Sequence, residues 1–255
     1  MGTDRTVVAV IPARYASHRL PGKPLIDLNG TTMIQRVYER VKQARMVDSV
    51  IVATDDERIM DSVAAVGGMS VMTDPGLPSG SDRVAAAVKD MQADIIVNVQ
   101  GDEPLIPPPM IDETIQALID TPDAGVATPS AKITDARDIT NPACVKVVTD
   151  TNGRVLYFSR SPVPHVRDAA EPKQWLESYS FMKHFGLYVF RRDVLEKFVT
   201  WNKTPLEEAE KLEQLRLLEN GIIVRVVETI YDSLSVDTAE DADRVREILK
   251  TTLEG

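Results

Sequence analysis

A chain of 255 residues with a hydrophobic share of 43% and a charged share of 27% is expected to fold as a globular protein. Its formal net charge of −10 argues against nucleic-acid binding, which needs a basic face, and no apolar run is long enough to cross a membrane. The single cysteine, Cys144, excludes a disulfide within the chain, and with no recognisable signal peptide we expect a protein of the cytoplasm.

Strand and helix signals alternate through the first hundred residues. Apolar runs predict strands at 6–11, 49–54, 69–73 and 94–99. The stretches between them predict helices at 33–44, 58–66 and 83–91. Such alternation is typical of parallel strands joined by helices, so we expect the α/β class with a doubly wound, mostly parallel sheet.

The pattern is less regular after residue 102. A helix is predicted at 110–119 and a strand at 125–132, and the turn at Asn152-Gly153 predicts a hairpin over 144–159. Residues 162–180 carry prolines and charges without a clear period, so we expect a long loop there.

Two further helices have clear start signals. Capping-box sequences predict helices that begin after Thr204 and Thr238. The simplest organisation is one domain over residues 1–255, with an inserted lobe at about 104–220.

Three cations follow the first predicted strand: Arg14, Arg19 and Lys23, around the turn Pro21-Gly22. Open α/β sheets bind ligands at the carboxyl ends of their strands, so this loop is placed to bind an anion with several charges, such as a nucleoside triphosphate. The loop matches neither G-x-x-x-x-G-K-[ST] nor G-x-G-x-x-G, so side-chain cations and backbone N–H groups would bind the phosphates. The alternative is a solvated loop whose cations only aid solubility.

Two aspartates are candidate metal ligands. Asp102 follows the strand predicted at 94–99, and Asp237 precedes a predicted helix. Mg²⁺ is usually held by one or two carboxylates together with phosphate oxygens, so the pair would complete a metal site beside a triphosphate. Each also has an ordinary explanation, because Gly-Asp is a common turn and an acid near a helix N-terminus is favourable through the helix dipole alone.

The turn Ser79-Gly80 enters the helix predicted at 83–91. Small residues at a helix N-terminus suit the close approach of a base or ribose. Ordinary helix capping by Ser81 or Asp82 explains the same residues equally well.

In the second half, alternation predicts a strand at 183–188 with His184 and Tyr188 on one face. These two side chains and Glu213 are candidates to surround a polyhydroxylated substrate. The ordinary alternatives are a histidine satisfied within the core and a glutamate on an exposed helix face.

Several stretches taken together point to one known family. They are Arg14–Leu25, Ala53-Thr54-Asp55, Ser79–Arg83, Val99–Pro104, Tyr157–Arg160, Lys183–Tyr188, Leu212–Arg216 and Val236-Asp237-Thr238. In these, the chain resembles the 3-deoxy-manno-octulosonate cytidylyltransferases, the CMP-Kdo synthetases, over nearly its whole length. The basic loop is shared with related sugar-nucleotide transferases, whereas Tyr-Phe-Ser-Arg, Lys-His-x-Gly-x-Tyr and Leu-Glu-Gln-Leu-Arg are more specific.

The resemblance implies a nucleotidyltransferase with a Rossmann-like fold, which converts CTP and 3-deoxy-D-manno-octulosonate (Kdo) to CMP-Kdo and pyrophosphate with Mg²⁺, for lipopolysaccharide biosynthesis. It implies triphosphate binding by Arg14, Arg19 and Lys23, and cytidine binding by Thr54, Asp55, Ser79 and Gly80. Metal ligands would be Asp102 and Asp237, which with Arg19 and Lys23 form the catalytic set. Kdo contacts would come from Arg83, Gln100, Arg160, His184, Tyr188, Glu213 and Gln214. The family also implies a homodimer formed through the inserted lobe, which would carry substrate contacts.

Two other interpretations remain at this point. The sugar acid could be 8-amino-Kdo or a sialic-acid-like nonulosonate, although the second-half motifs favour Kdo. The second interpretation is a non-catalytic nucleotide sensor on the same fold, but a sensor has no need of both Asp102 and Asp237.

Overall fold

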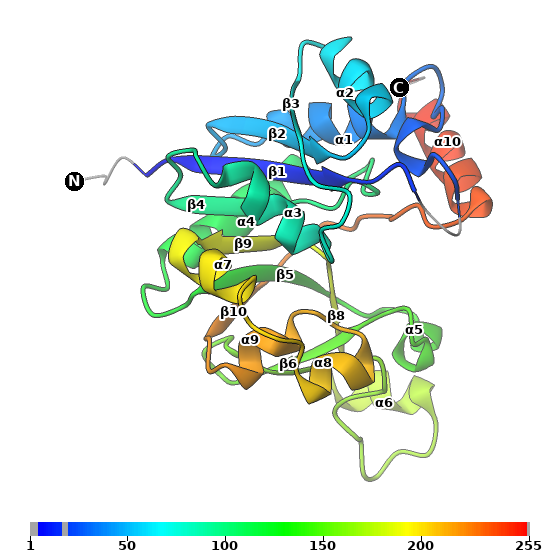
Figure 1. Cartoon of the computed structure of the whole chain (residues 1–255). Coiled ribbons are helices and arrows are strands. Elements are labelled where there is room, and N and C mark those ends of the chain that lie inside the picture. Colours follow the sequence, from blue (N-terminus) through cyan, green and yellow to red (C-terminus); the bar gives the residue numbers. More distant parts are fainter. Residues whose placement is uncertain (1–4, 17–19, 254–255) are drawn as a thin grey trace. The chain divides into compact units, whose positions relative to one another are not determined.

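The computed structural model describes residues 5–16 and 20–253 (Figure 1). Its contacts divide the chain into two compact units. Unit 1 comprises Met1–Asp112 and Asp232–Gly255, and unit 2 comprises Glu113–Tyr231. The expectation that 104–220 form a substrate and dimerisation lobe stays a prediction.

Unit 1 contains a parallel sheet of β1 (Val7–Ala13), β2 (Ser49–Thr54), β3 (Met69–Met72) and β4 (Ile95–Asn98), in the order β3-β2-β1-β4 (Figure 1). All four strands were predicted, to within two residues at each end. The chain moves outward from β1 to β3 and then returns to the other side of β1 for β4. In parallel sheets ligands bind at the carboxyl ends of the strands where the strand order reverses, which here is between β1 and β4.

Helices connect these strands as predicted. They are α1 (Met33–Lys42), α2 (Glu57–Ala64) and α3 (Gly80–Val88), and a short 3₁₀ turn, η1 (Lys23–Leu25), precedes α1. Helix α3 begins three residues before the predicted start, because the Ser79 hydroxyl accepts a hydrogen bond from the Asp82 N–H and caps the helix there.

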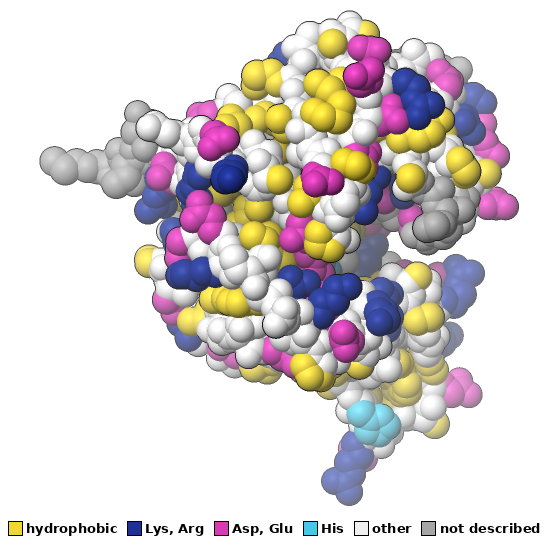
Figure 2. All heavy atoms as spheres, in the orientation of Figure 1, with side chains coloured by type: hydrophobic (Ala, Val, Ile, Leu, Met, Phe, Trp, Pro, Cys, Tyr) yellow, Lys and Arg dark blue, Asp and Glu magenta, His cyan; other side chains and the backbone are white. Residues whose placement is uncertain are grey.

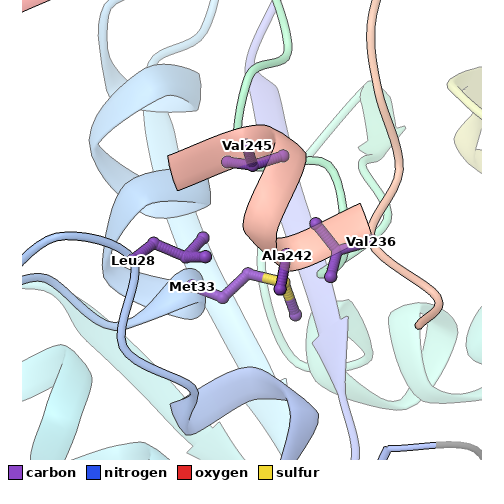
Figure 3. Packing of buried hydrophobic residues seen from close by; sticks show 5 residues of the cluster. All are labelled: Leu28, Met33, Val236, Ala242 and Val245. Carbon is purple, nitrogen blue, oxygen red and sulfur yellow. The ribbon is translucent and has the colours of Figure 1, made fainter. Parts of the chain in front are cut away.

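The C-terminal helix α10 (Ala239–Leu253) is anchored to the start of unit 1 by a buried cluster (Figure 3). Its members, from the loop before α1, from α1 and from the C-terminal segment, are Leu28, Met33, Val236, Ala242 and Val245. Burying an aliphatic side chain of this kind stabilises by about 1.5–3 kcal/mol. The cluster therefore fixes Asp237, which lies between two of its members in the sequence.

Unit 2 has a mixed sheet of β5 (Val126–Lys132), β6 (Lys146–Thr149), β7 (Val155–Ser159), β8 (Met182–His184), β9 (Tyr188–Arg191) and β10 (Val224–Glu228). β5 pairs antiparallel with β8 and β9, and β6 pairs antiparallel with β7 and β8; β10 is parallel to β5. The mostly parallel sheet predicted from the sequence therefore describes unit 1 and is wrong for unit 2. Short connections such as the β6–β7 turn return the chain directly beside itself, which gives antiparallel pairs.

The remaining helices are α4 (Pro108–Ile119), whose sequence crosses the boundary between the units, and, in unit 2, α5 (Ala136–Thr140), α6 (Pro172–Ser178), α7 (Arg192–Phe198), α8 (Pro205–Glu210) and α9 (Leu215–Glu219). The loop predicted at 162–180 was wrong in part, because it contains α6. This helix has Pro172 at its first position and a capping box formed by Glu171 and Gln174.

The strand predicted at 183–188 is also wrong as a single element. It is interrupted between β8 and β9, both of which pair with the same edge of β5. The carbonyl groups of Phe185 and Leu187 at the interruption lie 3.3 and 2.7 Å from the hydroxyl oxygen of Thr128, a side chain of β5.

The surface carries both signs of charge. On the face shown in Figure 2, Lys and Arg side chains are interspersed with Asp, Glu and apolar side chains. Among the described helices none is both long and apolar enough to span a membrane.

Candidate active site

The basic loop begins directly after β1. Nη2 of Arg14 donates to the carbonyl groups of Leu77 and Ser79, the latter at 3.4 Å. The loop closes where the Gly22 N–H donates to the Tyr15 carbonyl at 3.2 Å. Gly22 has φ +69°, and a Cβ there would lie 3.3 Å from the Tyr15 hydroxyl, so the turn requires glycine. Arg19, the third predicted cation, lies outside the described residues.

Lys23 brings the two predicted metal ligands together. Its ammonium lies 2.6 Å from Oδ2 of Asp102 and 3.0 Å from Oδ1 of Asp237, although these residues are far apart in the sequence. Burial alone would lower the pKa of Lys23, but the charges of and hydrogen bonds to the two carboxylates outweigh it and raise the pKa. Two carboxylates thus face one cation position.

Backbone contacts hold this pair in place. The Val236 N–H donates to the Asp102 carbonyl at 2.9 Å, and Oδ2 of Asp241 accepts from the N–H of Asp237 at 3.1 Å. On the other side, Gly101 approaches β1 so closely that a Cβ would lie 2.8 Å from the carbonyl oxygen of Pro12. The turn after β4 therefore needs glycine to place Asp102 beside β1.

A third acid, Glu103, lies next to the pair. It accepts a hydrogen bond from Ser233, which further ties the C-terminal segment to the turn after β4. Burial raises the pKa of Glu103 to about 7, and the nearby charges of Asp102 and Asp237 add to the effect. The sequence motif contained this residue but gave it no role.

The predicted cytidine residues Thr54 and Asp55 stand at the end of β2, where Asp55 contacts Arg83 directly and Thr54 contacts it through Thr73. Nη2 of Arg83 donates to Oδ2 of Asp55 at 3.0 Å, and Nη1 donates to the Thr73 hydroxyl, which in turn donates to the Thr54 carbonyl at 2.9 Å. The Tyr15 N–H donates to the other Asp55 oxygen at 3.4 Å. Arg83 is 0% exposed. The structure thus groups Arg83, a predicted Kdo contact, with the predicted cytidine residues.

The turn into α3 lies beside the end of β4. A Cβ on Gly80 would be 3.6 Å from Pro12 and 3.9 Å from Oε1 of Gln100. The Gln100 amide donates to Asn98 at 3.3 Å. The predicted nucleotide residues that the structure describes therefore gather near the carboxyl ends of β1, β2 and β4, where the strand order reverses.

In unit 2 the structure brings His184, Tyr188 and Glu213 together. The rings of His184 and Tyr188 have centroids 5.4 Å apart, and Phe158 stands 4.8 Å from the imidazole, edge to face. Burial lowers the pKa of His184 to about 3. Burial, with the charge of Glu213, raises the pKa of Tyr188 above its ordinary value. Both rings are therefore uncharged at neutral pH.

Arg160 follows β7, and its guanidinium is engaged by main-chain carbonyl groups. Nε donates to Glu210 at 2.7 Å, Nη1 to Pro142 at 2.9 Å and Nη2 to Lys211 at 3.3 Å. The Glu210 carboxylate in turn accepts from the Arg160 N–H at 2.9 Å. Arg160 thus fixes the end of α8, from which the chain continues to Glu213.

Gln214 is 5% exposed and occupies the N-cap position of α9. In the sequence it lies between the two partners of a buried ion pair, Glu207 and Arg216. Nε and Nη2 of Arg216 donate to the two Glu207 oxygens at 2.7 and 2.6 Å. Burial would raise the pKa of Glu207, but the hydrogen bonds and charge of Arg216 bring it below the ordinary value. This bidentate pair joins the short helices α8 and α9.

Three supporting groups were missed by the sequence reasoning. Thr128 contacts His184 from β5, Lys146 donates to the carbonyl of Arg160, and Glu207 pairs with Arg216. Thr128 and Lys146 lie in strands whose hydrophobic pattern indicates burial but not which groups their polar atoms contact. The sequence therefore contains no indication of these contacts. Arg216 stood in a recognised motif, but nothing local identified Glu207 as its partner.

Comparison with known proteins decides the family. A model of the cytidylyltransferase family matches residues 8–238. The chain belongs to this family. It is similar to a 3-deoxy-manno-octulosonate cytidylyltransferase of Pelobacter propionicus, with 51% identity over 94% of this chain and 96% of the relative, and to one of Geobacter metallireducens, with 50% identity over 95% and 97%. The predictions of a nucleotidyltransferase and of its family are confirmed.

Comparison with solved structures supports the same family. The chain resembles a structure described as CMP:2-keto-3-deoxy-manno-octonic acid synthetase complexed with CTP, at 42% identity and a TM-score of 0.90, over 97% of this chain and 99% of the other. A 4-diphosphocytidyl-2C-methyl-D-erythritol synthase from Anaerococcus prevotii, at 17% identity and a TM-score of 0.63, shares the fold alone. The mixed α/β fold is therefore that of the cytidylyltransferases.

Proposed function

We propose that the protein transfers the cytidylyl group of CTP to Kdo, releasing pyrophosphate and forming CMP-Kdo for lipopolysaccharide biosynthesis. The observation that carries the proposal is the convergence of Lys23, Asp102 and Asp237 where the strand order reverses. Family membership and the named relatives supply the substrates.

The nucleotide would be bound within unit 1. Arg14, Arg19 and Lys23 are proposed to bind the triphosphate, because they follow β1 in the sequence and ligands of parallel sheets bind at the carboxyl ends of the strands. Thr54, Asp55, Ser79 and Gly80 are proposed to line the cytidine site. The link from Arg14 to the Ser79 carbonyl supports a common site for these groups.

Asp102 and Asp237 suit Mg²⁺ as a donor set. Carboxylate oxygens are ligands that Mg²⁺ prefers, and the Lys23 ammonium already marks a position within 2.6 and 3.0 Å of both. In the part of the chain that the structure describes, no group of three or more His, Cys, Asp or Glu side chains is arranged for a metal. Two protein ligands leave the other positions to phosphate oxygens and water, as is usual for Mg²⁺. Bound there, the ion would supply charge neutralisation and a lowered pKa for a coordinated hydroxyl.

The transfer itself needs positioning and charge stabilisation more than covalent participation. The anomeric hydroxyl of Kdo would attack the α-phosphorus of CTP in line and lose its proton to solvent, while the bond from the α-phosphorus to pyrophosphate breaks. Lys23 and Arg19 would stabilise the negative charge that develops on the leaving group. Asp102 and Asp237 would hold the cation that neutralises charge at the reacting groups. His184, whose pKa is lowered to about 3, is too weak a base to take the proton of the attacking hydroxyl.

As Kdo contacts we propose Arg83, Gln100, Arg160, His184, Tyr188, Glu213 and Gln214. The proximity of His184, Tyr188 and Glu213 supports a polar sugar site. The guanidinium groups of Arg83 and Arg160 already donate hydrogen bonds that fix neighbouring segments. Any contact that they make with Kdo would be in addition to these bonds. We further propose that residues 104–220 provide the sugar contacts from Arg160 onward and the interface of a homodimer, and that the enzyme works in the cytoplasm.

Product analysis tests the choice of sugar. The protein is incubated with CTP, Mg²⁺ and one sugar acid at a time: Kdo, 8-amino-Kdo or N-acetylneuraminate. We expect mass spectrometry to find the CMP-linked product with Kdo. A product found only with one of the other two acids would contradict the proposal and identify the alternative substrate.

A further inference from the structure

Thr128 places a hydroxyl group within hydrogen-bonding distance of a ring nitrogen of His184. The residue is 0% exposed, and its oxygen lies 2.8 Å from Nε2 of His184. The same oxygen lies 2.7 Å from the carbonyl oxygen of Leu187 and 3.3 Å from that of Phe185. One hydroxyl thus has three polar neighbours and a single proton to donate.

The hydrogen-bonding capacity of these groups decides where the protons lie. A carbonyl oxygen can only accept, so the threonine proton goes to Leu187. Donation to His184 instead would leave two oxygens 2.7 Å apart with no proton between them. The hydroxyl must therefore accept from His184, which places a proton on Nε2. In a neutral imidazole the other nitrogen, Nδ1, is then an acceptor.

The surroundings keep this imidazole neutral. Phe158 and Tyr188 pack against the ring with centroids at 4.8 and 5.4 Å. Burial among such groups disfavours the charged form and lowers the pKa of His184 to about 3. At neutral pH the ring therefore has one donor and one acceptor nitrogen.

We infer that Thr128 is a positioning residue that fixes the Nε2–H tautomer of His184, so that Nδ1 accepts a hydrogen bond from a hydroxyl group of the sugar acid. The role toward the sugar rests on the proposed function, whereas the tautomer follows from the contacts within unit 2. A neutral acceptor favours a hydroxyl donor and disfavours a carboxylate. His184 thus recognises a hydroxyl of the sugar and leaves its acid group to the cations.

The tautomer is measured directly by two-bond ¹H–¹⁵N NMR on protein labelled at histidine, without substrates. The chain has three histidines, and His184→Gln assigns the signal. We expect a protonated Nε2 and an unprotonated Nδ1 at neutral pH. A protonated Nδ1 with an unprotonated Nε2 would overturn the inference.

Two variants of Thr128 separate positioning from folding. Thr128→Val keeps the shape and removes the hydroxyl, while Thr128→Ser keeps the hydroxyl. We expect Thr128→Val to populate the Nδ1–H tautomer and to raise the KM for Kdo about tenfold, for the loss of one oriented hydrogen bond, with the KM for CTP unchanged. Thr128→Ser should behave as the wild type in both measurements.

The matched control is Thr200→Val, because Thr200 is an exposed residue of unit 2 whose hydroxyl donates to the Lys197 carbonyl at 2.7 Å. It should change neither quantity. Equal rises in both KM values for Thr128→Val, or an unaltered tautomer and KM in that variant, would overturn the role of Thr128. If the wild type shows the expected tautomer but no turnover of Kdo, the proposed function fails while the tautomer assignment stands.

Discussion

Asp102 is the residue whose loss should separate chemistry from folding. Asp102→Ala removes half of the carboxylate pair at the proposed Mg²⁺ site, so turnover should fall by about two orders of magnitude or more. The side chain is partly exposed and lies in a turn, so the fold should survive. Pyrophosphate release and the unfolding temperature measure the two effects.

Asp90→Ala, at an exposed position of the same unit, is the control and should leave turnover unchanged. Turnover of Asp102→Ala within a few-fold of the wild type would refute the metal role of this carboxylate.

Substitution of Arg160 tests whether this residue supports the proposed sugar site. Arg160→Lys keeps the charge but cannot reproduce a planar group that donates to the carbonyls of Pro142, Glu210 and Lys211. We expect the KM for Kdo to rise more than the KM for CTP in steady-state kinetics. Arg137→Lys, at a fully exposed arginine of unit 2, should alter neither. A larger rise for CTP would place Arg160 at the nucleotide.

At the scale of elements, α8 and α9 depend on the ion pair between them. Helices of six and five residues are too short to be stable alone. Arg216→Met leaves the buried Glu207 carboxylate without its partner, which should lower the free energy of unfolding by about 3–5 kcal/mol. Urea denaturation measures the loss.

The exposed pair between Lys197 and Asp193 provides the comparison. Lys197→Met should cost no more than about 0.5 kcal/mol, because an exposed i,i+4 pair contributes little. Equal losses for Lys197→Met and Arg216→Met would contradict the importance of burial at Glu207.

The helices and strands also differ in how well they could be predicted from the sequence. Strands β1 to β4 and the capping boxes at Thr204 and Thr238 depend on local pattern, and they were predicted closely. The interruption at 185–187, whose carbonyl groups contact Thr128 more than fifty residues earlier, was missed. Asp102 and Asp237 were paired because one or two carboxylates usually hold Mg²⁺ beside phosphate oxygens. The cation between them, Lys23, was expected on phosphate instead, because no local pattern reports a contact across the sheet.

For the whole molecule, His184 should make stability depend on pH. Its pKa in the folded protein is lowered from 6.5 to about 3, so between these values the unfolded chain binds a proton that the folded chain does not. The free energy of unfolding should therefore fall as the pH drops from about 6.5 towards 3, by up to about 1.4 kcal/mol per pH unit from this group. Above pH 6.5 the residue contributes no slope.

His184→Gln should flatten this part of the profile, measured by urea denaturation at a series of pH values. His165→Gln, at an exposed histidine of the same unit, is the matched control and should keep the wild-type slope. An unchanged slope in His184→Gln would show that the imidazole is charged in the folded protein.

The most direct test of the proposed function is pyrophosphate release from CTP by the wild type, with and without Mg²⁺, and with Kdo, with N-acetylneuraminate or with no sugar. We expect release only when CTP, Kdo and Mg²⁺ are all present. Release with N-acetylneuraminate in place of Kdo, undiminished release without the metal, or no release with Kdo would contradict it.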